Sequence, residues 1–120
     1  MTKREIFLTD LALITCIVQR GLGDEIVLAA REAGAQGATI NYARGTGVRE
    51  RLGLLGVAVE VEKEVINIVV ASEQVDTVFD SIHHAGKLDT PGMGFMYVTP
   101  LEKAATYIPP HVVEKLEESG

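Results

Sequence analysis

The chain has 120 residues, a formal net charge of −6 at pH 7 and a single cysteine. This length predicts one compact domain over residues 1–120, and the lone cysteine excludes an intramolecular disulfide framework and a multi-cysteine zinc site. The acidic balance argues against a nucleic-acid partner, and the first residues lack the apolar core of a signal peptide, so we expect a cytoplasmic protein.

The first half of the chain predicts a strand, a helix and a second strand. An apolar run over 11–18 predicts the first strand. Apolar residues then recur at helical spacing between Asp24 and Gly34, which predicts a helix with Asp24 as its N-cap and Gly34 as its C-cap. Residues 38–43 predict the second strand.

The second half predicts the same order of elements. Valines alternate with polar or small residues over 53–64, which indicates a half-exposed strand that leads into the apolar run 65–70. Ser72 is the expected N-cap of a helix that closes at Gly86, and residues 94–99 predict the last strand. Residues 107–120 contain a stiff proline turn and then predict a solvated tail or a short charged helix.

The two halves resemble each other in sequence. A shift of 52 residues places Asp24 on Asp76 and Gly34 on Gly86, and a further shift of three places Tyr42 on Tyr97. A duplicated βαβ unit predicts an α+β, ferredoxin-like βαββαβ fold with two helices on one face of a four-stranded antiparallel sheet. Because the runs 11–18 and 65–70 are continuously apolar, both sheet faces should be covered, and we expect a homo-oligomer to cover the second face.

Two loops contain residues that can bind an anion. In the stretch 43–51, Gly45 and Gly47 can turn the backbone sharply and present N–H groups, and three arginines lie close by. An ordinary hairpin loop explains the same residues equally well. The stretch 86–94, with Lys87, can also hold a phosphate, although a plain helix-to-strand connection remains an equal alternative.

Other reactive residues do not form a recognisable catalytic or metal site. His83 and His84 are adjacent on a helix and point about 100° apart, so they cannot easily chelate one ion. Cys16 lies within an apolar strand and should be an inert, buried thiol. The sequence shows no nucleophile with a base beside it, so we expect no enzymatic activity and no bound metal.

Several of these segments resemble the PII signalling proteins, the nitrogen-regulatory family. The resemblance extends from about residue 11 to residue 98 and includes 37–39, the Ala-Arg-Gly-Thr-Gly segment at 43–47, the run 65–70, and Ala-Gly-Lys-Leu at 85–88. It is closest to a PII-like branch. It implies a ferredoxin-like homotrimer that binds an adenine nucleotide (ADP, AMP or ATP) in clefts between subunits, with no covalent cofactor. It also implies a T-loop that reports the nucleotide state to a membrane transporter or a metabolic enzyme in nitrogen or carbon metabolism.

The resemblance also implies which residues bind. Those expected at the nucleotide are Gly37, Thr39, Arg44, Gly45, Thr46, Gly47, Gly86, Lys87, Leu88, Gly92, Met93, Gly94 and Lys103. Those expected in the T-loop, in contact with the target, are Val48, Arg49, Glu50, Arg51 and Leu52.

The chain departs from the family pattern at the phosphate end of this site. Gly92 or Met93 stands where nitrogen-regulatory members carry a second lysine, and only Lys103 is basic after the last strand. A triphosphate would have fewer partners, which favours ADP or AMP. The T-loop has no tyrosine for nucleotidylylation, and Val48 or Arg49 stands in place of the glutamine that aids 2-oxoglutarate and Mg binding. The alternative is a trimeric metal-tolerance protein of the CutA kind, which shares the architecture.

Overall fold

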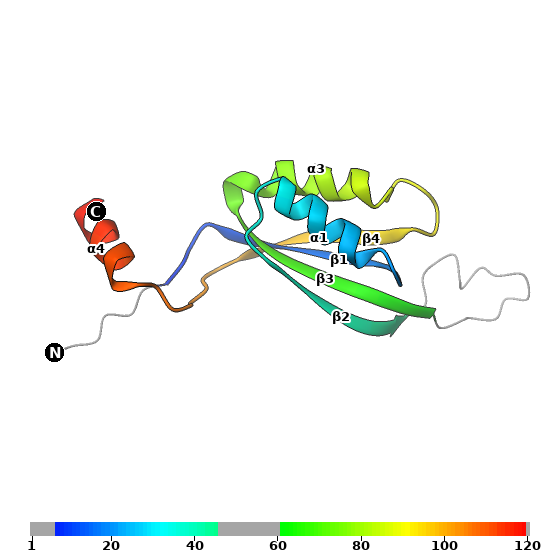
Figure 1. The fold of residues 1–120 in the computed structure, drawn as a ribbon, viewed down its shortest axis with the longest axis horizontal. Helices are drawn as coiled ribbons and strands as arrows, with labels where there is room; N and C mark the ends of the chain where they lie inside the picture. The colour runs from blue at the N-terminus through cyan, green and yellow to red at the C-terminus, as the bar shows by residue number, and fades with distance from the viewer. Residues whose placement is uncertain (1–6, 46–60, 120) are drawn as a thin grey trace, which may run out of the picture.

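The computed structural model describes residues 7–45 and 61–119, and shows a four-stranded antiparallel sheet with helices on one face (Figure 1). The strand order is β2-β3-β1-β4, so the two central strands come from the two halves of the chain. The elements are β1 (Leu11–Gln19), α1 (Gly23–Glu32), β2 (Ala38–Gly45), β3 (Val61–Ala71), the 3-10 turn η1 (Ser72–Gln74), α3 (Val75–Ala85), β4 (Gly94–Leu101) and α4 (Pro110–Ser119). The ferredoxin-like prediction is confirmed.

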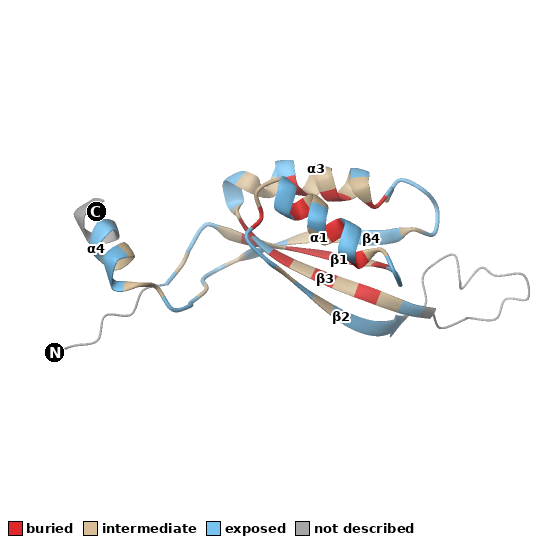
Figure 2. Ribbon diagram, viewed as in Figure 1, coloured by how far each residue is buried: buried red, intermediate tan, exposed pale blue. Residues whose placement is uncertain are grey.

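The hydrophobic core lies between the sheet and the helices α1 and α3 (Figure 2). Side chains alternate between the two faces of a strand, and the even-numbered positions of β1 and β3 are the ones turned toward the helices. Ile14, Ile66 and Ile68 are completely buried there, against Ile26 of α1 and Ile82 of α3.

The opposite face of the sheet has no helix over it among the described residues (Figure 1). It still carries apolar side chains, of which Val69 is 46%, Phe95 65% and Tyr97 41% exposed. In the middle of this face Thr15 donates a hydrogen bond to Asn67, its cross-strand partner, at 3.0 Å. The apolar runs of the central strands therefore do have a second apolar face, as the sequence indicates.

The register of the strands contradicts one match of the predicted repeat, that of Tyr42 with Tyr97. Tyr42 shares the parity of Ile40, which packs on the core, whereas Tyr97 lies between Met96 and Val98, which pack on the core from β4. The two tyrosines therefore lie on opposite faces of the sheet, and the match of Tyr42 with Tyr97 is wrong.

Both predicted N-caps are wrong. Helix α1 begins at Gly23, after Leu22 as its N-cap, and α3 begins at Val75, after the 3-10 turn that starts at Ser72. Asp24 therefore lies in the first helical turn. For α1, the Glu64 side chain of β3 supplies the acceptor and binds the amide of Gly23 at 2.9 Å. Before α3, the Gln74 side chain accepts the amide of Ala71, the last residue of β3, at 3.3 Å.

The helix C-termini end in the same hydrogen-bond pattern, a Schellman motif. After α1, the amide of Gly34 donates to Arg31 and that of Ala35 to Ala30; Gly34 has φ +113° and follows Ala33, the actual C-cap. After α3, Gly86 is the C-cap, and it is Lys87, with φ +51°, that has the left-handed conformation. The structural counterpart of Gly34 is thus Lys87 and not Gly86.

The segments 7–10 and 102–119 extend beyond the sandwich at the end opposite the close of β2 and the start of β3 (Figure 1). Leu8 and Ala104 pair there through backbone hydrogen bonds of 2.7 and 2.9 Å, and α4 follows. In the described parts of the chain, no helix has both the length and the apolar character needed to cross a membrane.

Candidate functional site

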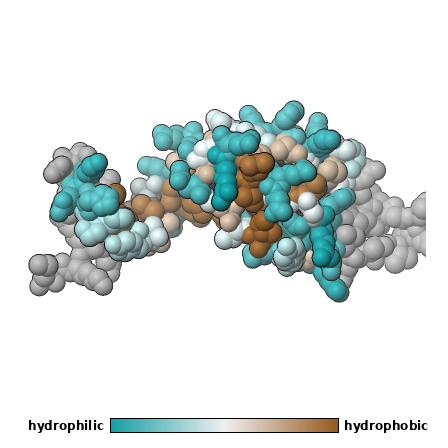
Figure 3. Space-filling model, in the orientation of Figure 1, coloured by the Kyte–Doolittle hydropathy of each residue, from teal (hydrophilic) through white to brown (hydrophobic). Residues whose placement is uncertain are grey.

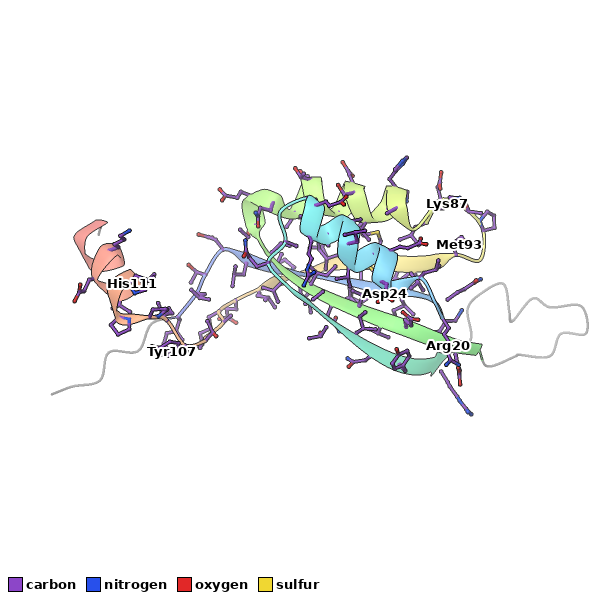
Figure 4. All side chains as sticks on the ribbon, viewed as in Figure 1. Arg20, Asp24, Lys87, Met93, Tyr107 and His111 are labelled. Atoms are coloured by element: carbon purple, nitrogen blue, oxygen red, sulfur yellow. The ribbon has the colours of Figure 1, made fainter. Side chains whose placement is uncertain are left out.

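Four strand termini meet at one end of the sheet. The antiparallel register brings the ends of β1 and β2 beside the starts of β3 and β4. Figure 4 shows Arg20, Lys87 and Met93 at this end, and Tyr107 and His111 beyond the opposite one. The loop 86–94 and the base of the 46–60 connection, the two segments that the sequence singles out, therefore share one end of the molecule.

The loop 86–94 consists of two tight turns in series. The amide of Thr90 donates to the carbonyl of Lys87 at 2.9 Å, and the amide of Met93 donates to the carbonyl of Thr90 at 3.2 Å. The side-chain amide of Gln19, at the end of β1, donates to the carbonyl of Gly92 at 2.6 Å. These bonds give the loop a defined shape next to the sheet.

Lys87 begins this loop as an exposed residue in the left-handed region. That conformation costs a non-glycine residue about 1–2 kcal/mol, and a lysine is not among the residues that tolerate it best. Backbone strain of this kind is concentrated at functional sites. The position makes Lys87 the strongest candidate for an anion contact in the loop.

The end of β2 borders a cavity of about 420 Å³, whose lining residues are Arg20, Tyr42, Ala43, Arg44 and Glu62. Arg44 and Glu62 are cross-strand partners, and the guanidinium of Arg20 pairs with the Glu62 carboxylate at 2.5 Å. Because Arg20 and Glu62 are both largely exposed, this ion pair should contribute little to stability. The two arginines leave the cavity with a net positive rim.

Glu64 fastens the turn 19–23, the β1–α1 turn, to the start of β3. Its carboxylate accepts the amide of Gly21 at 2.5 Å and that of Gly23 at 2.9 Å, and the residue is only 7% exposed. A negative charge at the first turn of a helix is favoured by the free amides and by the helix dipole. This carboxylate replaces the N-cap that Asp24 was expected to provide.

Sequence reasoning missed Gln19, Arg20 and Glu64. One signal was available for Glu64, because it is an acid at an inward-facing position of a strand that continues with Ile66 and Ile68. A carboxylate at such a position must find hydrogen-bond donors. Nothing in the sequence indicates the partners of Gln19 and Arg20, which lie 73 and 42 residues away.

Cys16 is fully buried on the core face of β1, and burial raises the pKa of its thiol to about 12. The thiol is therefore protonated at neutral pH and is not a nucleophile. Within 7–45 and 61–119, no group of three or more His, Cys, Asp or Glu side chains is placed to hold a metal ion.

A comparison with protein-family models matches residues 11–108 to the family described as nitrogen regulatory protein P-II. This match extends over most of the chain and includes both loops of the site.

The chain belongs to the PII family.

A solved structure, that of Arabidopsis thaliana PII bound to citrate, has the same fold. It is 23% identical in sequence, with a TM-score of 0.61, and the match covers 78% of this chain and 79% of that one. A search of curated proteins finds no match. PII proteins are signal transducers and not enzymes, which confirms the prediction that the chain is non-enzymatic, and they generally bind adenine nucleotides.

The PII residues predicted at the nucleotide do not all meet within one chain. Residues 86–94 and Arg44 lie at the same end of the sheet but at its opposite edges, because β2 and β4 are the two outer strands. Thr39 is near the start of β2, about 17 Å from Arg44 at 3.3 Å per residue. Lys103 lies past β4 at the opposite end, with its Nζ 4.8 Å from the ring centroid of Phe7. Gly37 is exposed just before β2.

Part of the predicted site lies outside the described residues. Thr46 and Gly47 of the anion-binding stretch belong to this part, and so do all the T-loop residues, 48–52. The described portion of that stretch ends with Arg44 and Gly45 on β2.

Proposed function

We propose that this PII protein is a cytoplasmic, trimeric adenine-nucleotide sensor that regulates a membrane transporter or a metabolic enzyme in nitrogen or carbon metabolism. The observation that carries the proposal is the loop 86–94, in which a strained, exposed Lys87 opens a double turn anchored by Gln19. Such a loop presents a cation and backbone groups in a fixed arrangement, which suits a phosphate. We take residues 1–120 as one PII-like domain.

Two observations support the proposed trimer: the uncovered sheet face and the separation of the site residues. An exposed apolar face that includes Val69, Phe95 and Tyr97 favours burial against further copies of the chain. Thr39 and Lys103 lie far from Lys87 within one chain, so a neighbouring copy would supply them to the same cleft. The T-loop residues 48–52 are assigned to target contact by the family resemblance alone.

We expect the site to prefer ADP or AMP over ATP. Lys87 and Arg44 are the described cations at this end that we assign to phosphate. The family resemblance implies a second lysine in the loop, and this chain has Gly92 or Met93 at that position. A third phosphate would therefore bring charge without a matching partner.

Calorimetry with ADP, AMP and ATP tests the sensor directly. Lys87→Gln and Arg44→Gln should each weaken ADP binding about tenfold or more, as expected for loss of a charge-assisted bond. Arg31→Gln, an equivalent change at an exposed residue in the last turn of α1, should leave the affinity unchanged. Absence of binding by any of the three nucleotides to an intact assembly would refute the sensing role, and unchanged affinity in both site variants would refute the site. No observation favours the metal-tolerance alternative.

A further inference from the structure

The β1–α1 turn holds the start of β3 through polar contacts. Glu64 accepts the amides of Gly21 and Gly23. Arg20 pairs with Glu62, two residues nearer the start of the strand, but this ion pair is exposed and adds little to the hold. Because Glu64 is nearly buried, water competes poorly for its carboxylate, and the charge-assisted bonds are strong. The start of β3 is therefore fixed relative to the turn.

The same turn also holds the loop 86–94. Gln19 is its first residue, and its side chain donates to the carbonyl of Gly92 at 2.6 Å. Gly92 belongs to the second tight turn of the loop, between the amide of Met93 and its acceptor at Thr90. A shift of this turn therefore moves the acceptor of Gln19.

The connection through the β1–α1 turn is stiff. A Cβ atom on Gly23 would lie only 2.1 Å from Oε2 of Glu64, so the helix backbone touches the carboxylate with no side chain between them. The turn is bounded by β1 and by α1, whose residues Val18 and Ile26 are completely buried. Little of a displacement can be absorbed within such a segment.

We propose that the β1–α1 turn is a coupling element between the loop 86–94 and the start of β3. A ligand that draws the loop toward its phosphate moves Gly92, and the turn transmits this displacement to Glu64, which accepts two of its amides. Because β3 follows the 46–60 connection in sequence, ligand occupancy is passed toward the segment assigned to the target. The proposal rests on the proposed function for the identity of its ligand. The contacts that join Gly92, the β1–α1 turn and Glu64 are present in the ligand-free protein.

Hydrogen exchange of the ligand-free protein tests the link itself. Gln19→Leu keeps the size of the side chain and removes the donor, and we expect several-fold faster exchange both in 86–94 and at the amides of Gly21 and Gly23. Glu64→Gln, which removes the charge at the other end of the link, should also speed exchange in 86–94. Gln36→Leu, the same change as the first at an exposed residue between α1 and β2, should match the wild type.

Exchange with and without ADP then tests transmission. In the wild type, ADP should slow exchange in 86–94 and at 61–66, and Gln19→Leu should bind ADP but lose most of the effect at 61–66. The proposal is overturned if Gln19→Leu loosens 86–94 alone, or if it retains the full ADP effect at 61–66. If ADP has no effect on the wild type, the proposed function fails, and the ligand-free experiment still decides whether the link exists.

Discussion

At the scale of the residue, Lys87 and Gly34 end their helices in the same way with very different side chains. Both have a positive φ and both donate their amides into the last turn of a helix. Glycine adopts this conformation without steric cost, whereas lysine does not. The lysine therefore weakens the fold locally, and its charge at the mouth of the loop is the feature that a glycine could not supply.

Lys87→Gly should separate stability from binding. We expect the free energy of unfolding to rise by about 0.5–1 kcal/mol because the steric strain is relieved, with part of the gain lost to the greater freedom of the unfolded chain. ADP affinity should fall at the same time. Lys87→Gln is the control, since it keeps the strain and should lose affinity without gaining stability; urea unfolding and calorimetry provide the two readouts.

Cys16 predicts a pH dependence. Its pKa is near 12 in the folded chain and 9.0 in the ordinary thiol, so between these values the unfolded chain holds fewer protons than the folded one. Stability should therefore be fully present below pH 9 and fall as the pH rises toward 12. Urea unfolding on both sides of pH 9 should show a smaller fall for Cys16→Ala than for the wild type, because other titrating groups are common to both; equal falls would contradict the prediction.

At the scale of the element, the sequence predicts the strands and both helices because local apolar periodicity is strong in this chain. Helix starts could not be predicted, because the acceptor for the first amide of α1 lies on β3 and a 3-10 turn comes before α3. Glu64, on another strand, replaces Asp24 as the acceptor for α1, and Gln74 belongs to a 3-10 turn that precedes α3. The C-termini of the helices were better predicted, because the hydrogen bonds of a Schellman motif are local. The repeat nevertheless placed Gly34 on Gly86 and missed the role of Lys87.

The two candidate loops were also recognised from their own residues, but how they are held was not. The contacts of Gln19 with Gly92 and of Arg20 with Glu62 join segments that are remote in sequence and follow from the strand order. The wide separation of Thr39 and Lys103 from Lys87 likewise depends on topology, and no spacing along the chain reveals it.

Gly23→Ala tests the contact between α1 and β3. The added Cβ would overlap the Glu64 carboxylate, and we expect a loss of about 2–3 kcal/mol in unfolding free energy, the usual range for overpacking combined with a disturbed buried hydrogen bond. Gly37→Ala is the matched change, because a Cβ there meets nothing within 4 Å. It should leave stability unchanged within about 0.5 kcal/mol or raise it slightly. Equal losses in both variants would show that the contact has no special role.

At the scale of the whole molecule, the helical side and the uncovered sheet face differ in how their exposed apolar side chains are arranged. In the view of Figure 3, the most prominent apolar patch lies near the centre of the molecule among hydrophilic side chains, and smaller apolar areas lie to either side of it. Leu28 of α1 is 58% exposed on the helical side. The other face presents Phe95 and Tyr97, whose rings are 5.8 Å apart, on an uncovered sheet. Among the described residues, this sheet face is the one that we propose is buried between copies of the chain.

Phe95→Asp should dissociate the proposed trimer. In the trimer, a charge on the uncovered face would be buried without a partner. The symmetry of the assembly would repeat this unfavourable burial at every interface between copies. Leu28→Asp places the same charge on an exposed residue of the helical side and should leave the assembly intact. Light scattering after size-exclusion chromatography gives the masses, and circular dichroism verifies that both variants are folded. A trimeric Phe95→Asp variant would refute this interface.

The placement of Lys87 and Lys103 at opposite ends of the sandwich predicts how two different variants behave when they assemble together. If each cleft takes Lys87 from one chain and Lys103 from the next, two inactive variants should complement each other. Lys87→Gln and Lys103→Gln, each unable to bind ADP tightly when alone, should regain high-affinity sites when unfolded together and refolded as mixed trimers. Random assembly at equal amounts would restore about a quarter of the clefts, and a titration of the mixture would count them.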